Sequence, residues 1–172
     1  MPRPSCQFQI RRTVLVVVEG DTEFAFCRHL KAIGSHQRNL QVTIKNAHGG
    51  SPDKIINFAR QHARQSAYDA IAVVFDADKP LTTQGEKAAR AIRARLIRLD
   101  PCVEGFFLRL LKHPVPATTA ACKRTFHTCG LNASEKVDHD AYSTVFPLSR
   151  IDEFLTDPDF AALWNLFTNN SP

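Results

Sequence analysis

The sequence lacks several patterns that would assign it to a specialised class of protein. Its five cysteines are odd in number and scattered, with no C-x-x-C pair, so we expect reduced thiols rather than a disulfide framework. The spacing of Cys122, His127 and Cys129 matches no common zinc finger. No apolar run approaches the ~20 residues of a transmembrane helix, and the first eight residues lack the apolar core of a signal peptide. We therefore expect a cytoplasmic protein with no membrane partner.

Repeats and nucleophile motifs are absent as well. The chain shows no internal repeat and no low-complexity tract, and its serine, cysteine and histidine residues form no recognisable nucleophile–base motif. With 172 residues, 44% of them hydrophobic and 23% charged, the composition is that of an ordinary globular protein. We expect a single domain, large enough to bury a substantial core.

Charge is distributed unevenly along the chain. Residues 1–133 hold 20 basic and 10 acidic residues, a net charge of +10, whereas residues 134–172 hold 2 basic and 7 acidic residues, a net charge of −5. A basic body favours a polyanionic partner such as DNA or RNA. Scattered surface arginines explain the same charge equally well, so charge alone does not decide the partner.

Apolar runs alternate with amphipathic stretches through the first two thirds of the chain. The runs at 13–18, 40–45 and 70–75 predict strands, and 94–99 predicts a short fourth strand unless the preceding helix continues through its arginines. Helical spacing predicts helices at 22–33, 52–66, 83–93 and 101–112, and further helical segments at 118–129, 138–144 and 158–168. This order predicts an α/β fold, with a mainly parallel four-stranded sheet, helices on both faces and a helical C-terminal extension.

Most acidic residues of the basic body lie at predicted strand ends. Because the carboxyl ends of parallel strands share one edge of a sheet, these side chains are expected to lie close together. Clustered carboxylates repel one another unless a cation joins them, which indicates a hard divalent metal such as Mg²⁺ or Mn²⁺. Seven of the ten acids share this placement: Glu19, Asp21, Glu23, Asp76, Asp78, Asp100 and Glu104.

Each carboxylate also has a structural explanation. Asp76 and Asp78 are two residues apart at a strand end and are suited to holding a metal, although Asp-x-Asp is also good turn chemistry. Glu19 and Glu23 flank the start of a predicted helix, where an anion is favoured by the helix dipole. Glu23 is thus either a dipole partner or a second-metal ligand. Glu104 is either a functional carboxylate or an exposed position on an apolar helix.

Two further groups could contact a phosphate. Gly20 permits a tight strand-to-helix turn and close approach of a phosphate. The turn Gly49-Gly50-Ser51 could expose backbone N–H groups to an anion, although simple turn geometry explains a Gly-Gly pair at least as well. Lys79, beside the aspartate pair, could neutralise charge on a phosphoryl transition state.

Together these residues resemble the TOPRIM fold, the catalytic module of topoisomerases, bacterial primases and OLD-family nucleases. Glu19-Gly20 and Asp76-Ala77-Asp78 match its two motifs, and Glu19-Gly-Asp-Thr-Glu23 resembles the OLD-type variant. The turn Gly49 to Pro52 and the stretch Pro101 to Glu104 resemble small RloB-like proteins, which are associated with mobile elements and phage defence. The resemblance covers residues 13–112 and implies a Rossmann-like core there. We expect residues 113–172, which carry no such resemblance, to pack on this core as a helical extension within a single domain.

The resemblance also implies roles for the site residues. Asp76 and Asp78 would bind Mg²⁺ or Mn²⁺, Glu23 would be a second ligand, and Glu104 a site residue of unassigned role. Glu19 would either ligate metal or act as general acid or base. The implied function is metal-dependent hydrolysis of DNA or RNA.

Two alternatives remain open. One is a non-catalytic subunit that binds nucleic acid, a partner ATPase or a second copy of itself. The other is a phosphatase of the haloacid dehalogenase type, since Val73 to Asp78 resembles the nucleophile strand of that family. The later acidic pair of that family is missing.

Overall fold

Four parallel strands form the centre of the protein in a computed structural model that describes residues 11–34 and 39–168. The strands are β1 (Arg12–Val18), β2 (Leu40–Asn46), β3 (Ala70–Asp76) and β4 (Ala94–Leu99). Their order in the sheet is β2-β1-β3-β4, and every neighbouring pair is parallel. The strand order places β1 and β3 at the centre and leaves β2 and β4 as the two edges.

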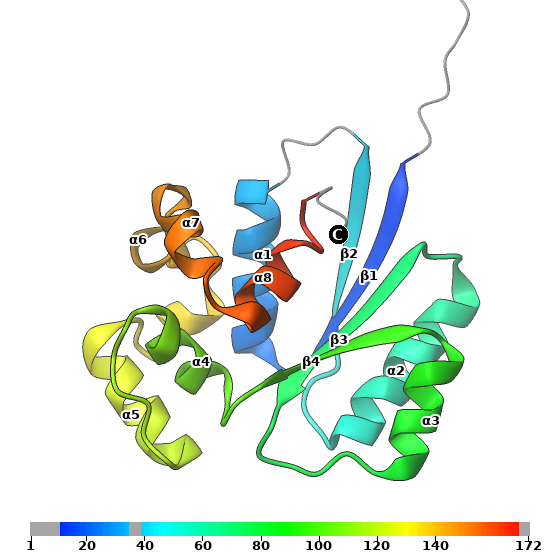
Figure 1. Ribbon diagram of the computed structural model, residues 1–172, viewed down its shortest axis with the longest axis horizontal. Helices are drawn as coiled ribbons and strands as arrows, with labels where there is room; N and C mark the ends of the chain where they lie inside the picture. Colours follow the sequence, from blue (N-terminus) through cyan, green and yellow to red (C-terminus); the bar gives the residue numbers. More distant parts are fainter. Residues whose placement is uncertain (1–10, 35–38, 169–172) are drawn as a thin grey trace, which may run out of the picture.

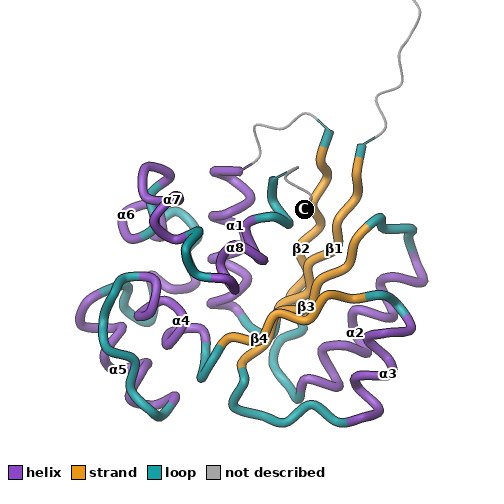
Figure 2. Tube along the Cα trace, in the orientation of Figure 1, coloured by secondary structure: helices purple, strands orange, loops and turns teal. Residues whose placement is uncertain are grey.

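Helices cover both faces of the sheet (Figure 1). One face carries α2 (Pro52–Gln65) and α3 (Thr83–Ala91). The other carries α1 (Asp21–Gly34) and the C-terminal half of the chain, where Figure 2 shows short helices joined by many loops. These C-terminal elements are α4 (Val103–Leu110), α5 (Thr119–Cys129), η1 (Glu135–Val137), α6 (Tyr142–Val145), η2 (Leu148–Arg150), α7 (Ile151–Phe154) and α8 (Pro158–Trp164). The α/β fold with a helical C-terminal extension is thereby confirmed.

The sheet separates two hydrophobic clusters. Val14, Val16 and Val18 of β1 face the larger cluster with α1 and the C-terminal helices. Leu15 and Val17 face the smaller cluster with α2 and α3. Side chains alternate between the faces of a strand, so β1 is apolar at every one of these positions because both faces are covered.

Several element boundaries differ from those predicted. The fourth strand at 94–99 is confirmed, whereas the preceding helix ends at Ala91 rather than at residue 93. Thr82 caps α3, since its hydroxyl accepts a hydrogen bond from the Gly85 N–H. The helix predicted at 101–112 is shorter and begins at Val103. Among the described helices, none has the length and apolar character needed to cross a membrane.

Candidate functional site

The ends of the two central strands are joined by a direct hydrogen bond. Glu19 follows β1, and Asp76 is the last residue of β3. The backbone N–H of Asp76 donates to Glu19 Oε2 at 3.1 Å. The strands pair in register up to Val18 and Val74, so the carboxylates at 19 and 76 are neighbours, as the strand-end argument predicted.

Asp76 lies between the sheet and the start of α4. Its Oδ1 accepts a hydrogen bond of 2.9 Å from the Val103 N–H, the first of that helix. Burial raises the pKa of Asp76 to about 8, and the charges of Glu23 and Glu19 act in the same direction. Without a cation, the protein therefore holds this carboxyl largely protonated at neutral pH.

Glu23 lies in the first turn of α1 and is only 5% exposed. Its Oε2 accepts a hydrogen bond of 3.1 Å from the Gly20 N–H, which is the reverse half of a capping box. Burial raises the pKa of Glu23 to about 7, with contributions from the charges of Glu19 and Glu104. A Cβ at position 20 would lie 3.2 Å from that same Oε2, so a side chain there would disturb Glu23. Glu23 thus has a helix-start role and also contributes to the carboxylate cluster.

Glu104 is almost completely buried, at 1% exposure, in the first turn of α4. Its Oε1 accepts a hydrogen bond of 2.6 Å from the ammonium of Lys136, which is itself buried in η1. Its Oε2 is buried with no hydrogen-bond partner among the described residues. Glu104 is therefore not an exposed helix position, and the C-terminal extension supplies its countercharge.

A cavity of about 230 Å³ brings these groups together at the carboxyl edge of the sheet. Five of the seven predicted strand-end carboxylates line it, together with Gly20 and Gly49 of the predicted phosphate contacts. Lys123 of α5 is an exposed cation at the same cavity that the sequence patterns did not identify. The lining residues are Glu19, Gly20, Asp21, Thr22, Glu23, Gly49, Asp76, Val103, Glu104 and Lys123.

Two predicted catalytic residues lie outside this lining. Asp78 is exposed in the turn after β3, so its role as a metal ligand stays a prediction. Lys79 is half exposed, with its Nζ 3.6 Å from Glu19 Oε1 and donating to the Gly50 carbonyl at 3.0 Å. Lys79 is close enough to Glu19 to influence the charge of the site without lining the cavity.

The glycine pair forms a turn that is anchored to the end of β1. Three consecutive residues have positive φ angles: His48 (57°), Gly49 (82°) and Gly50 (131°). Glycine adopts positive φ angles most readily, and it occupies two of these three positions. The Gly49 N–H donates to the Glu19 carbonyl at 2.7 Å. Gly50 and Ser51 do not line the cavity, and Ser51 begins α2 without a side-chain cap. Turn geometry therefore accounts for most of this motif.

The residues at the cavity fit a hard divalent cation. Mg²⁺ and Mn²⁺ prefer oxygen ligands, and the unpartnered Glu104 Oε2 lies at the same cavity as several other carboxylates. Burial raises the pKa of Asp76 and of Glu23, and the neighbouring carboxylates add to both shifts. Among the described residues, ligand atoms of three or more metal-binding side chains come within 4.8 Å of one another only at Asp138, His139 and Asp140. Those are consecutive, largely exposed residues far from the strand ends, whereas the cavity carboxylates are more widely spaced.

Comparison with known proteins identifies the family. A search of curated proteins and a search of solved structures found no match. The sequence model of the RloB-like protein family matches residues 14–142, a segment that includes every residue lining the cavity and Lys136. Because the match covers well over half of the 172 residues, the chain belongs to the RloB-like protein family.

Proposed function

We propose that this chain is a Mg²⁺- or Mn²⁺-dependent phosphodiesterase acting on DNA or RNA. The observation that supports the proposal most directly is the group of five acidic side chains around one cavity, which come from the ends of β1 and β3 and from the first turns of α1 and α4. One of them, Glu104, has a buried oxygen with no hydrogen-bond partner among the described residues. The proposal includes a relation to TOPRIM and OLD-type nucleases, and with it a role in phage defence or on a mobile element.

In this proposal Glu19, Glu23, Asp76 and Glu104 hold the cation, with Asp78 as a further ligand from the adjacent turn. The bound cation would act as a Lewis acid and lower the pKa of a water ligand. Val103 fixes the Asp76 carboxylate through its N–H, and Gly20 fixes Glu23 in the same way. Glu19 is either a ligand or the general acid or base, held in place by the Asp76 N–H and flanked by Lys79.

Two lysines at the site offer positive charge to a phosphate. Lys123 lines the cavity from α5, and Lys79 lies beside Glu19. An ammonium near the phosphoryl oxygens stabilises the negative charge that develops there during hydrolysis. In this proposal the carboxylates bind the cation, and the lysines contact the phosphate.

A metal-titrated cleavage assay tests the proposal. We expect Mg²⁺ or Mn²⁺ to support cleavage of single-stranded DNA, double-stranded DNA or RNA by the parent protein. Asp76→Ala should abolish it, while Arg95→Ala on the far edge strand β4, exposed and away from the cavity, should not. Equal cleavage by Asp76→Ala would overturn the proposal. Hydrolysis of small phosphomonoesters instead would indicate the phosphatase alternative.

A further inference from the structure

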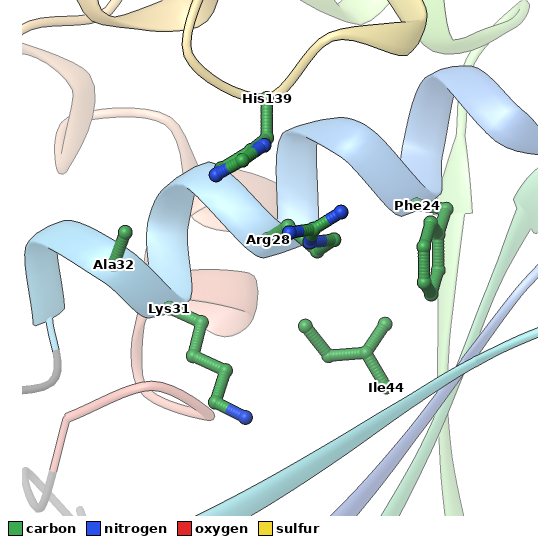
Figure 3. A pocket seen from close by; sticks show the side chains of 6 residues that line it. All are labelled: Phe24, Arg28, Lys31, Ala32, Ile44 and His139. Carbon is green, nitrogen blue, oxygen red and sulfur yellow. The ribbon is translucent and has the colours of Figure 1, made fainter.

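A second surface begins next to the carboxylate cavity and follows the edge strand β2. One opening, of about 410 Å³, lies between α1 and β2, and Figure 3 shows Arg28, Lys31 and Phe24 of α1 around the same space as Ile44 of β2. A second opening, of about 600 Å³, continues around the edge of the sheet to Phe58 and His62 of α2.

The two openings are adjacent and share lining residues with each other and with the carboxylate cavity. Phe24 and Ile44 line both openings along β2. Asp21 lines the second opening and also the carboxylate cavity. The two openings together are here called the β2 groove, which leads from His139 past β2 towards the candidate metal site.

The β2 groove is basic. Its two openings are lined by Arg28, Lys31 and Lys45 and by a single carboxylate, Asp21, which accepts a hydrogen bond of 2.7 Å from the Asn46 side chain. Lys31 donates to the Val42 carbonyl on the free edge of β2 at 2.7 Å, which holds its positive charge beside the strand. At the far end, His139 Nε2 lies 3.2 Å from Asp140 Oδ1. An excess of cations along a groove attracts a polyanion.

Aromatic rings alternate with these cations. Phe24 projects from α1 on one face of the sheet, and Phe58 from α2 on the other, and both are only partly buried. Phe58 also packs edge-on against the His62 ring, with 4.6 Å between ring centroids. Basic side chains interleaved with accessible rings are typical of grooves for unpaired nucleic acid, because only unstacked bases can stack on a protein ring.

We propose that the β2 groove binds a single strand of nucleic acid and leads its backbone to the carboxylate cavity. This inference rests on the proposed function and specifies its substrate as unpaired DNA or RNA. The strand's phosphates contact Arg28, Lys31 and Lys45, and its bases stack on Phe24 and Phe58. A duplex keeps its bases paired and stacked, so it cannot use the rings.

The test measures binding without cleavage. Fluorescence anisotropy in EDTA would compare a labelled single strand of about 16 nucleotides, as DNA and as RNA, with the duplex of the same sequence. We expect tighter binding of the single strand. Arg28→Glu/Lys45→Glu should weaken it at least about tenfold and lower the slope of log K against log salt by about two, since two phosphate contacts are lost. Phe24→Leu should weaken it about tenfold through lost stacking.

A matched control places the same charge change on the opposite edge of the sheet. Arg95→Glu/Arg98→Glu on β4 replaces two exposed arginines, and its affinity should stay within about twofold of the parent. Equal loss in this control, equal binding of duplex, or no binding by the parent would each overturn the proposal. Light scattering would reveal whether a second copy occupies the β2 groove instead, as a dimer that Arg28→Glu/Lys45→Glu dissociates. EDTA removes the metal, so this assay measures binding to the β2 groove without cleavage. Its result therefore does not depend on the outcome of the cleavage assay.

Discussion

Asp76 connects the pH of the solution to the stability of the metal-free protein. Its pKa is about 8 in the folded chain, against an ordinary value of 3.8. The folded state thus retains a proton that the unfolded state releases, and the contribution of this carboxyl to stability is full below pH 4 and lost as the pH rises towards 8. In the variant Asp76→Asn the side chain at position 76 does not titrate, while its Oδ1 can still accept the hydrogen bond from the Val103 N–H.

We therefore expect metal-free Asp76→Asn to melt close to the parent near pH 4 and at increasingly higher temperature than the parent towards pH 8. Thermal melts in EDTA across this range, monitored by circular dichroism, would measure the difference. Groups that do not interact with Asp76 titrate equally in both proteins and cancel in the comparison. A Tm difference that does not change with pH would contradict the account of Asp76.

The two aspartates after β3 should differ in their effect on metal binding. Asp76 lines the cavity, whereas Asp78 is exposed in the following turn. We expect Asp76→Asn to weaken Mn²⁺ binding at least about tenfold, because it removes a ligand charge, and Asp78→Asn to weaken it less. Isothermal titration with Mn²⁺ gives both affinities. The reverse order would mean that the turn rearranges to make Asp78 the principal ligand.

At the scale of residues, the sequence predicted some side chains of the site and missed others. Glu19 and Asp76 were predictable because each directly follows an apolar run, and parallel strands end at one edge. Lys136 and Lys123 come from segments that show no strand-end pattern. Their only signal is compositional: Lys136 is one of two basic residues in an otherwise acidic segment, and nothing local pairs it with Glu104.

Among the elements, η1 matters most for the site because it supplies Lys136. We expect Lys136→Met to lower the free energy of unfolding by about 3–5 kcal/mol, the usual result of leaving one buried charge unpaired. The measurement is urea denaturation without metal. Mg²⁺ or Mn²⁺ should recover more stability in this variant than in the parent, because a bound cation can replace the ammonium beside Glu104.

The control for Lys136→Met is the double variant Glu104→Gln/Lys136→Met. Removing both charges leaves no uncompensated carboxylate, so the double variant should be more stable than the single one. If both variants are equally unstable, packing of the lysine chain and not its charge supports α4.

Element prediction succeeded where the pattern was strong. The β-branched run of β1 and the helical spacing of α1 identified both elements to within about two residues, the usual boundary error. The pattern of β4 was ambiguous because its exposed Arg95 and Arg98 are three residues apart, a spacing that also occurs on one face of a helix. The four-residue helices α6 and α7 are too short to show a period, so their positions depend on packing against the rest of the molecule.

The whole molecule is held together by an aromatic cluster that crosses from the sheet-covering helices to the C-terminal extension. The ring of Phe26 in α1 lies 4.8 Å from that of Phe107 in α4, 5.4 Å from Tyr142 and 5.3 Å from Phe146. Contacts between aromatic rings stabilise the folded state in addition to the stabilisation that comes from burying their apolar surface. Whether residues 13–112 fold as a separate core therefore stays a question for experiment.

We expect a chain truncated after residue 133 to lose cooperative folding. The truncation removes Tyr142 and Phe146 from the aromatic cluster and exposes the rings of Phe26 and Phe107. Circular dichroism melts and binding of a hydrophobic dye would report the loss of fixed packing. A sharp thermal transition like that of the full chain would instead show that residues 134–172 are dispensable for folding.

The position of Lys136 in the chain has a consequence for protein synthesis. The chain leaves the ribosome from its N-terminus, so Glu104 emerges 32 residues before the lysine that neutralises it. A nascent or prematurely ended chain therefore has the carboxylates of the strand ends but not the ion pair that lets Glu104 be buried. The ion pair that supports the candidate site therefore forms only after most of the chain has been translated.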